Sequence, residues 1–207
     1  MKINEPTFTG INIANVADRN IKVYRITKKD CEFLELLSKD FDAKQLMPHL
    51  DKDSVDVYNS MVESSTKAAK RPSKQAMLLT YNDKPCGIMV NSKDGQFKQH
   101  IDYLCTWRPK GEEKKAPFGA QTLFLQMFKD FLNTQAKTIE LNAIRYGNAI
   151  SKYISLGFKP IGGNGYTETM RISRADIESK MGALTEKIHL KSTNTEKDED
   201  LVNRLIF

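Results

Sequence analysis

The chain has 207 residues, and 40% of them are hydrophobic, which is enough for one sizeable core and predicts one domain with extensions. Its 32 lysines and arginines exceed its 26 acidic residues, and the net charge of +6 favours anionic partners. That charge is too diffuse to indicate nucleic acid rather than a phosphorylated cofactor. The cysteines, Cys31, Cys86 and Cys105, lack the spacing of a disulfide framework or a zinc site, so we expect no metal.

The distribution of apolar residues indicates in which cellular compartment the protein is expected. The first twenty residues contain no apolar run of signal-peptide length, and no window approaches the roughly 18 apolar residues of a membrane span. We therefore expect a cytoplasmic protein that keeps its thiols reduced and has no membrane partner. Export by a route without a classical signal peptide stays open.

The chain begins with a polar segment, residues 1–20, which contains the turn formers Pro6 and Gly10. We expect a loose arm or an edge element there. Apolar residues in 21–24 then predict the first strand.

Two helices are expected after this strand. Thr27 has the pattern of an N-cap, and Asp30 supplies the carboxylate of a capping box that opens the first helix. Residues 42–48 interrupt the apolar period. A second helix is expected over 54–70, and the proline at position 72 ends it.

The middle of the chain predicts strands and one long helix. Strands are expected over 76–81, 86–91 and 96–107, and the turn-rich joints between them indicate an antiparallel meander. Apolar residues at helical spacing predict a helix over 119–132, and a strand is expected over 138–144. A strand, helix and strand in succession predict a right-handed crossover between parallel strands.

The last third of the chain predicts a short helix, a strand and a helical tail. The short helix spans 147–156 and ends at Gly157, after which Phe158 leads toward a strand around 166–172. A further helix is expected over 175–190. The order βααβββαβαβ indicates a mixed α/β (α+β) fold.

This order resembles that of the GNAT superfamily of N-acetyltransferases, the acyl-CoA N-acyltransferase fold. Members carry a Tyr-x-x-Leu-Gly-Phe signature after the fifth strand, and residues 153–158 read Tyr-Ile-Ser-Leu-Gly-Phe here. The resemblance implies a GNAT-like domain over 21–172, between an N-terminal arm, 1–20, and a C-terminal helical extension, 173–207. It also implies a mostly antiparallel central sheet, flanked by helices, in which one parallel pair splays apart.

The resemblance further implies acetyl-CoA as the co-substrate. In the family, the donor lies along the end of the fourth strand and on a turn before the long helix, which corresponds here to Lys-Lys-Ala-Pro-Phe-Gly at 114–119. Pro117 has no N–H for the pyrophosphate, although two lysines of the turn add positive charge. Tyr146 stands where many members carry Asn, and an asparagine follows two residues later. The expected cofactor-binding residues are Leu104, Cys105, Thr106, Trp107, Lys114, Lys115, Phe118, Gly119, Ala120 and Asn148.

Acyl transfer to an amine needs a neutral amine and a proton for the departing thiolate. The resemblance assigns the second role to Tyr153, whose counterpart in the family lies beside the cofactor sulfur. His100 and Asp102 point to one side of the fourth strand, near the place of the family's catalytic carboxylate, and are the candidate bases. A water relay without a single base is equally compatible.

Together these residues predict an N-acyltransferase that moves an acetyl group from acetyl-CoA to a primary amine by direct attack. The polar, lysine-rich segment 42–73 lacks a dense acidic cluster, which favours a protein or peptide amine, while small-molecule acceptors stay open. Monomer and homodimer also stay open. The alternative, motivated by Pro117 and the missing asparagine, is a catalytically inactive GNAT-like binding or regulatory domain. Specific nucleic-acid binding is poorly supported, because the basic residues are spread along the whole chain.

Overall fold

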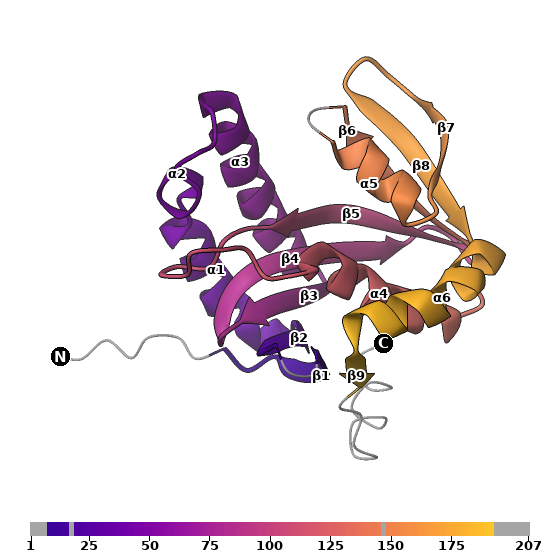
Figure 1. The fold of residues 1–207 in the computed structure, drawn as a ribbon, viewed down its shortest axis with the longest axis horizontal. Coiled ribbons are helices and arrows are strands. Elements are labelled where there is room, and N and C mark those ends of the chain that lie inside the picture. The colour runs from indigo at the N-terminus through magenta and orange to yellow at the C-terminus, as the bar shows by residue number, and fades with distance from the viewer. Residues whose placement is uncertain (1–7, 17–18, 146–147, 193–207) are drawn as a thin grey trace.

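The computed structural model describes residues 8–16, 19–145 and 148–192, which form a nine-stranded sheet with helices on both faces (Figure 1). The strands are β1 (Ile11–Val16), β2 (Ile21–Arg25), β3 (Lys74–Tyr81), β4 (Lys84–Lys93), β5 (Lys98–Thr106), β6 (Thr138–Ile144), β7 (Lys159–Gly163), β8 (Thr167–Ser173) and β9 (Leu190–Ser192). The helices are α1 (Cys31–Asp40), α2 (Ala43–Leu46), α3 (Lys52–Ala69), α4 (Gly119–Leu132), α5 (Ala149–Ser155) and α6 (Arg174–Ile188), with a 3-10 turn, η1, at Lys28–Asp30.

The strands lie in the order β7-β8-β6-β5-β4-β3-β2-β1-β9. Only β5 and β6 run parallel, and every other pairing in the described part of the chain is antiparallel. The predicted mixed α/β fold, with a mostly antiparallel sheet and one parallel pair, is confirmed.

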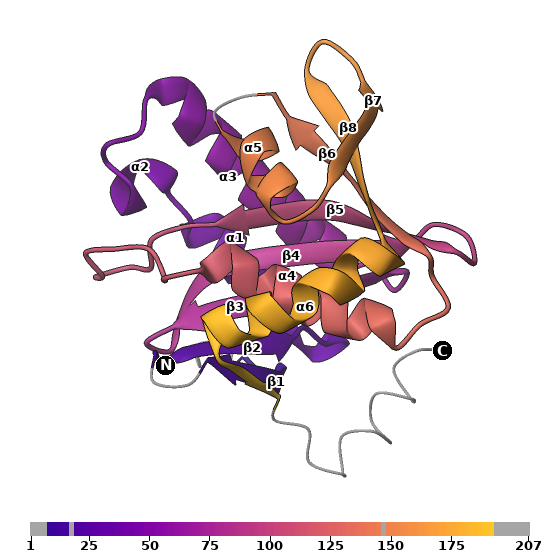
Figure 2. The same ribbon diagram turned by 45° about the vertical axis from the view of Figure 1, so that its right-hand side comes forward.

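Two hydrophobic cores lie on the two faces of the sheet. Helices α1, α2 and α3 cover one face, with Leu34, Val62 and Trp107 in its core. Helices α4 and α6 cover the other, where α6 crosses α4 (Figure 2). The central strands β3 and β4 are consequently buried in continuous runs, 76–80 and 86–91, as expected for strands covered on both sides.

Side-chain caps begin several of the helices. The predicted capping box is confirmed, since the Thr27 N–H donates to the Asp30 carboxylate at 2.8 Å. The other oxygen of Asp30 accepts from the Thr9 N–H at 2.7 Å, which ties the chain before β1 to the start of α1. The Ser173 hydroxyl caps α6 by accepting from the Asp176 N–H at 3.1 Å.

A partly buried arginine closes the other end of the long helix α4. Arg174, the first residue of α6, donates from its guanidinium to the carbonyl oxygens of Phe131, Leu132, Thr134 and Ala136. The last carbonyls of a helix lack partners within the helix, and a charged, planar donor with several N–H groups satisfies them together. This contact holds α6 against the end of α4.

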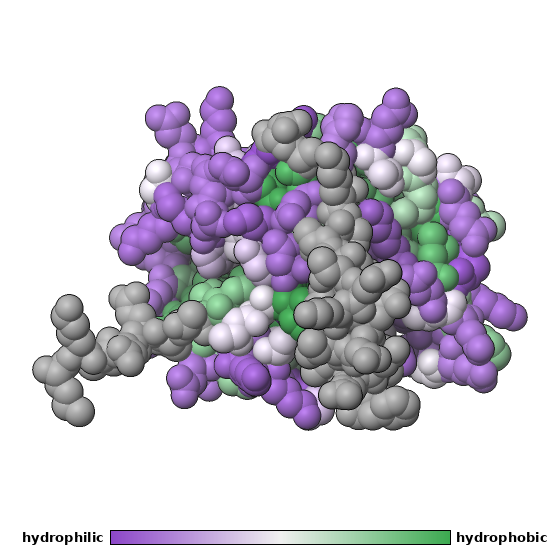
Figure 3. Space-filling view, turned by 90° about the horizontal axis from the view of Figure 1, so that it is seen from below, coloured by the Kyte–Doolittle hydropathy of each residue, from purple (hydrophilic) through white to green (hydrophobic). Residues whose placement is uncertain are grey.

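The surface on the side of β1 and β9 is mostly hydrophilic, with apolar residues in small separate areas (Figure 3). Among the described residues, no helix is both long enough and apolar enough to cross a membrane.

The structure adds elements to the predicted order. Strand β1 lies within the segment expected to be an arm or an edge element, and β9 pairs with it. Strand β7 and the short helix α2 were not predicted. All five residues of β7 are exposed, so its sequence lacks the alternation that indicates a strand. The predicted start of the short helix at Gly147, and the tail at 193–207, lie outside the described residues.

Candidate active site

The parallel strands β5 and β6 separate halfway along their length. Their pairing ends at Ile101 and Leu141, although β5 continues to Thr106 and β6 to Ile144 (Figure 1). At the same level, the register between β5 and β4 shifts by one residue, which leaves Asp102 as the extra residue of a β-bulge. The carboxyl end of β5 therefore presents a free backbone edge toward β6.

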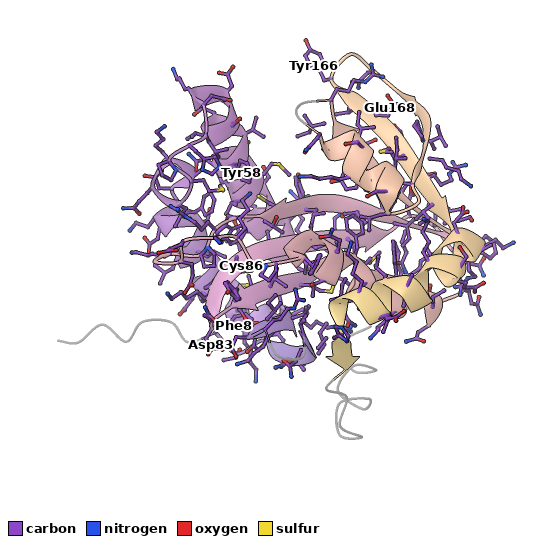
Figure 4. All side chains as sticks on the ribbon, viewed as in Figure 1. Phe8, Tyr58, Asp83, Cys86, Tyr166 and Glu168 are labelled. Carbon is purple, nitrogen blue, oxygen red and sulfur yellow. The ribbon has the colours of Figure 1, made fainter. Side chains whose placement is uncertain are left out.

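Two adjoining cavities lie at these splayed ends. The first, of about 340 Å³, lies at the amino end of α4 and reaches α5. The second, of about 350 Å³, lies between α3, the end of β5 and α5. Tyr58, Thr106, Ala120 and Lys152 line both, so the two cavities form one continuous depression. Figure 4 shows Tyr58 on α3 and Cys86, which lines the first cavity, on β4.

The amino end of α4 opens onto the first cavity. Phe118 precedes the helix with a left-handed φ of 57°, and no side chain among the described residues caps it. The Gly119 N–H donates to the Ala116 carbonyl at 3.2 Å, whereas Ala120 and Gln121 lie in the cavity wall within the first turn. Amides of a first helical turn lack partners within the helix, and the helix dipole favours an anion beside them.

Lys115 bridges the two sides of the depression. Its ammonium donates to the Tyr58 hydroxyl at 3.1 Å and to the Thr106 carbonyl at 3.3 Å, and it lies 5.0 Å from the centre of the Tyr58 ring. It therefore joins the end of β5 to α3. Neither Tyr58 nor Lys152 was predicted as a site residue. The helical period indicated only that Tyr58 faces the core, and Lys152 is a single lysine on a short helix.

Tyr153 lies in an aromatic cluster beside the second cavity. Its ring centre is 5.8 Å from that of Phe124 and 6.0 Å from that of Phe158, both edge to face. Burial raises the pKa of Tyr153 to about 12, and the Cys105 thiol contributes a smaller part in the same direction. The phenol is thus protonated at neutral pH and is able to donate.

The Cys105 thiol is also held protonated. Burial raises its pKa to about 12, and the nearby Lys115 ammonium offsets this only in part. A thiol attacks as the thiolate, so this environment argues against Cys105 as a nucleophile.

The two candidate bases lie together but outside both cavities. Asp102 accepts from the Lys74 ammonium with both carboxylate oxygens at 3.0 Å, and the His100 Nδ1 lies 3.5 Å from Asp102 Oδ1. Neither residue is part of the lining of either cavity. Asp102 therefore belongs to an ion pair between β5 and β3.

Solved structures with the same architecture identify the fold. FdhC, a nucleotide-linked sugar GNAT in its apo form, superposes with a TM-score of 0.56 over 88% of this chain and 99% of its own, at 10% sequence identity. The PaiA N-acetyltransferase from Thermoplasma acidophilum, in complex with coenzyme A, gives 0.51 over 74% and 98%, at 14% identity. Mutant forms of the spermidine/spermine N-acetyltransferase SpeG from Vibrio cholerae give 0.50 over 78% and 98%, at 15% identity.

The chain has the GNAT fold. At the level of sequence, no family model and no curated protein matches it.

The cavities of this GNAT fold contain most of the residues predicted to bind the cofactor. Thr106, Trp107, Lys115, Phe118, Gly119 and Ala120 line the first cavity. Leu104, Cys105, Thr106, Ala120, Asn148 and Tyr153 line the second. Lys114 is exposed and lines neither of these two cavities.

Two further predictions concern Tyr146 and the absence of a metal. Tyr146 lies outside the described residues, while Asn148 precedes α5 and accepts at its carbonyl from the Lys152 N–H at 3.2 Å. Within the described ranges, no group of three or more His, Cys, Asp or Glu side chains is arranged to hold a metal ion.

Proposed function

We propose that the protein is an N-acyltransferase that moves an acyl group, in the simplest case acetyl, from acyl-CoA to a primary amine. The observation that carries the proposal is the splayed end of β5 and β6, which opens onto two joined cavities. One cavity offers an uncapped helix end for phosphate, and the other offers a protonated tyrosine for the thioester. A CoA complex of a structure with the same fold supports the choice of donor.

The donor would lie across both cavities. Its pyrophosphate would lie in the first cavity, beside the amides of Ala120 and Gln121 and the ammonium of Lys152. Pro117 removes one N–H from the loop, but these amides follow it on α4 and are unaffected. The pantetheine arm would then pair with the free backbone edge of β5 up to Thr106, where it would replace the bond from Lys115.

The reaction would proceed by direct attack. The amine nitrogen forms a bond to the thioester carbonyl carbon, and the carbon–sulfur bond then breaks. Tyr153 gives its proton to the departing thiolate, and the proton lost by the amine restores the phenol. This assignment rests on the second cavity beside Tyr153 and on the pKa that keeps the phenol protonated.

For the base, we propose a water relay in preference to Asp102 or His100. The Asp102 carboxylate already accepts from Lys74 with both oxygens, and neither side chain lines a cavity. A substitution Asp102→Asn that leaves turnover of the enzyme within about threefold would support the relay, because removal of a true base typically costs about 10²-fold or more.

The acceptor proposed is a protein or peptide amine. The wall of the second cavity on the α3 side is formed by Leu50, Val57 and Met61, and no acidic residue is among the described residues that line it. A polycation would find no counter-charge there. An apolar side chain beside the reacting amine would bury its surface against this wall.

The decisive experiment measures thiol release from acetyl-CoA with a panel of peptides, small amines and polyamines. With the best acceptor, Tyr153→Phe should lower kcat by about 10²-fold at saturating donor. Tyr166→Phe is the matched control, because Tyr166 is 85% exposed at the turn between β7 and β8 (Figure 4). Full turnover by Tyr153→Phe would refute the assignment of the acid. Binding of acetyl-CoA without thiol release would instead favour the inactive binding or regulatory domain.

A further inference from the structure

Two cations from outside the predicted GNAT-like segment meet on one aromatic ring. The guanidinium carbon of Arg19 lies 5.0 Å from the centre of the Phe118 ring, and the Lys187 ammonium lies 5.2 Å from it. Phe118 is the residue immediately before α4, and it lines the first cavity. Both positive charges therefore lie beside a residue in the wall of the cavity proposed to hold the donor, although neither side chain lines that cavity.

The fold of the two ends of the chain brings these cations together. Arg19 lies between β1 and β2, whereas Lys187 lies in the last turn of α6. Strand β9, which follows α6, pairs with β1 through Ala14, Asn15 and Val16. The segments on either side of 21–172 thus meet at one edge of the sheet and next to the first turn of α4.

The charges at this place are not neutralised within the described part of the protein. Other cations of the neighbouring strands have carboxylate partners, such as Lys22 with Asp83 at 2.6 Å and Lys84 with Glu112 at 2.9 Å. Arg19 and Lys187 have no such partner among the described residues. The aromatic ring attracts each cation but does not neutralise its charge.

The first cavity itself strengthens the positive field. Lys115 and Lys152 line it, and none of the described residues in its wall is acidic. Arg19 and Lys187, which lie outside the phosphate loop, add two positive charges beside Phe118 in the wall of this cavity. Arginine and lysine beside an open cavity favour phosphate, since each forms charge-assisted hydrogen bonds with its oxygens.

We propose that Arg19 and Lys187, held on the Phe118 ring, form a phosphate-binding site at the rim of the first cavity and bind a phosphate group of CoA. This inference rests on the proposed function, because it takes CoA as the ligand. It assigns a role in donor binding to Arg19, which lies just before β2, and to the last turn of α6. Both are positioning elements for the donor and take no part in the chemistry.

The test is calorimetric titration of the full chain with CoA, dephospho-CoA and pantetheine. Relative to the unaltered protein, the double variant Arg19→Gln, Lys187→Gln should bind CoA about tenfold more weakly, the size of one or two charge-assisted contacts. The loss should shrink as salt is raised, because exposed charges are screened. The matched control is Lys28→Gln, Lys93→Gln, which removes the same charge at exposed positions that line neither donor cavity.

The three ligands separate the possible outcomes. If the loss disappears with dephospho-CoA, the cations bind the 3′-phosphate; if it persists there and disappears with pantetheine, they bind the pyrophosphate. Equal CoA affinity of the double variant and the control overturns the inference and leaves the proposed function intact. Failure of the unaltered protein to bind CoA overturns both. Phe118→Leu should weaken CoA binding in the same direction, because it removes the ring while both charges remain.

Discussion

Replacing Arg174 should destabilise the whole fold, because this side chain joins the end of α4 to the start of α6. Its guanidinium donates to four carbonyl oxygens at distances from 2.5 to 3.3 Å, and it lies 4.9 Å from the centre of the Phe131 ring. The carbonyls belong to the end of α4 and the loop that follows, and the Phe131 carbonyl also accepts from the Thr134 N–H at 2.9 Å and from the Thr134 hydroxyl at 2.8 Å.

Arg174→Met keeps the apolar stem and removes every donor. A lost hydrogen bond to a charged group costs about 1.5–3 kcal/mol, and the cation–π contact about 0.5–1 kcal/mol more. The side chain is 29% exposed, so water replaces some of the lost bonds. We therefore expect the free energy of unfolding to fall by about 2–4 kcal/mol, and Tm to fall by roughly 4–16 °C for a chain of this length.

The assay is thermal and urea unfolding of the variant beside two controls. Glu178→Gln removes the carboxylate that lies 3.9 Å from the Arg174 guanidinium, and it should change stability by less than about 0.5 kcal/mol. Arg174→Lys, which keeps the charge but has a single donor group, should fall in between. If Arg174→Met lost less than about 1 kcal/mol, the carbonyl contacts would not stabilise the junction as argued.

Three other changes test separate parts of the structure. Burial raises the pKa of the Cys86 thiol to about 12, so the folded state keeps a proton that the unfolded state releases near pH 9. The free energy of unfolding should therefore fall as the pH rises above 9, by up to about 1.4 kcal/mol per pH unit for each such thiol. Cys86→Ala should make this slope shallower in urea titrations at about pH 8 to 11. An unchanged slope would contradict the assignment. Lys115→Met should weaken CoA binding about tenfold in calorimetry, since it removes a cation from the first cavity, and unaltered affinity would show that Lys115 serves only its contacts with Tyr58 and Thr106. Gly157→Ala should lower the free energy of unfolding by about 1–2 kcal/mol in thermal unfolding, because Gly157 has a φ of 102° and a Cβ there would lie 2.8 Å from the Lys180 side chain. A decrease below about 0.5 kcal/mol would show that the backbone of this turn adjusts to the substitution.

Local patterns predicted those elements whose signals lie within a few neighbouring residues. The bounds predicted for α4 and β6 are those of the structure, 119–132 and 138–144. The capping box at Thr27 was also found correctly, because both partners lie within one turn. Strand β7 was missed, since an exposed edge strand has no buried face to impose alternation.

The strands at one edge of the sheet, β1 and β9, form by pairing between segments that are far apart in the sequence. Residues 11–16 contain four apolar residues but lie within a polar segment that was expected to be an arm or an edge element, and in the structure they form a strand between β2 and β9. A three-residue strand such as β9 carries almost no sequence signal. Its hydrogen bonds are satisfied only when the chain returns to β1 after α6.

In the candidate site, too, some features follow from local sequence and others only from contacts between distant segments. The sequence alone indicated the fold and a set of site residues most of which line the two cavities, because these residues follow one another along the end of β5, the start of α4 and α5. Only the tertiary structure decided what surrounds them. Lys74 pairs with Asp102 from another strand, Tyr58 meets Lys115 from α3, and the cations at Phe118 come from both ends of the chain. No local period or motif encodes such contacts, because each joins residues that become neighbours only when the sheet is assembled.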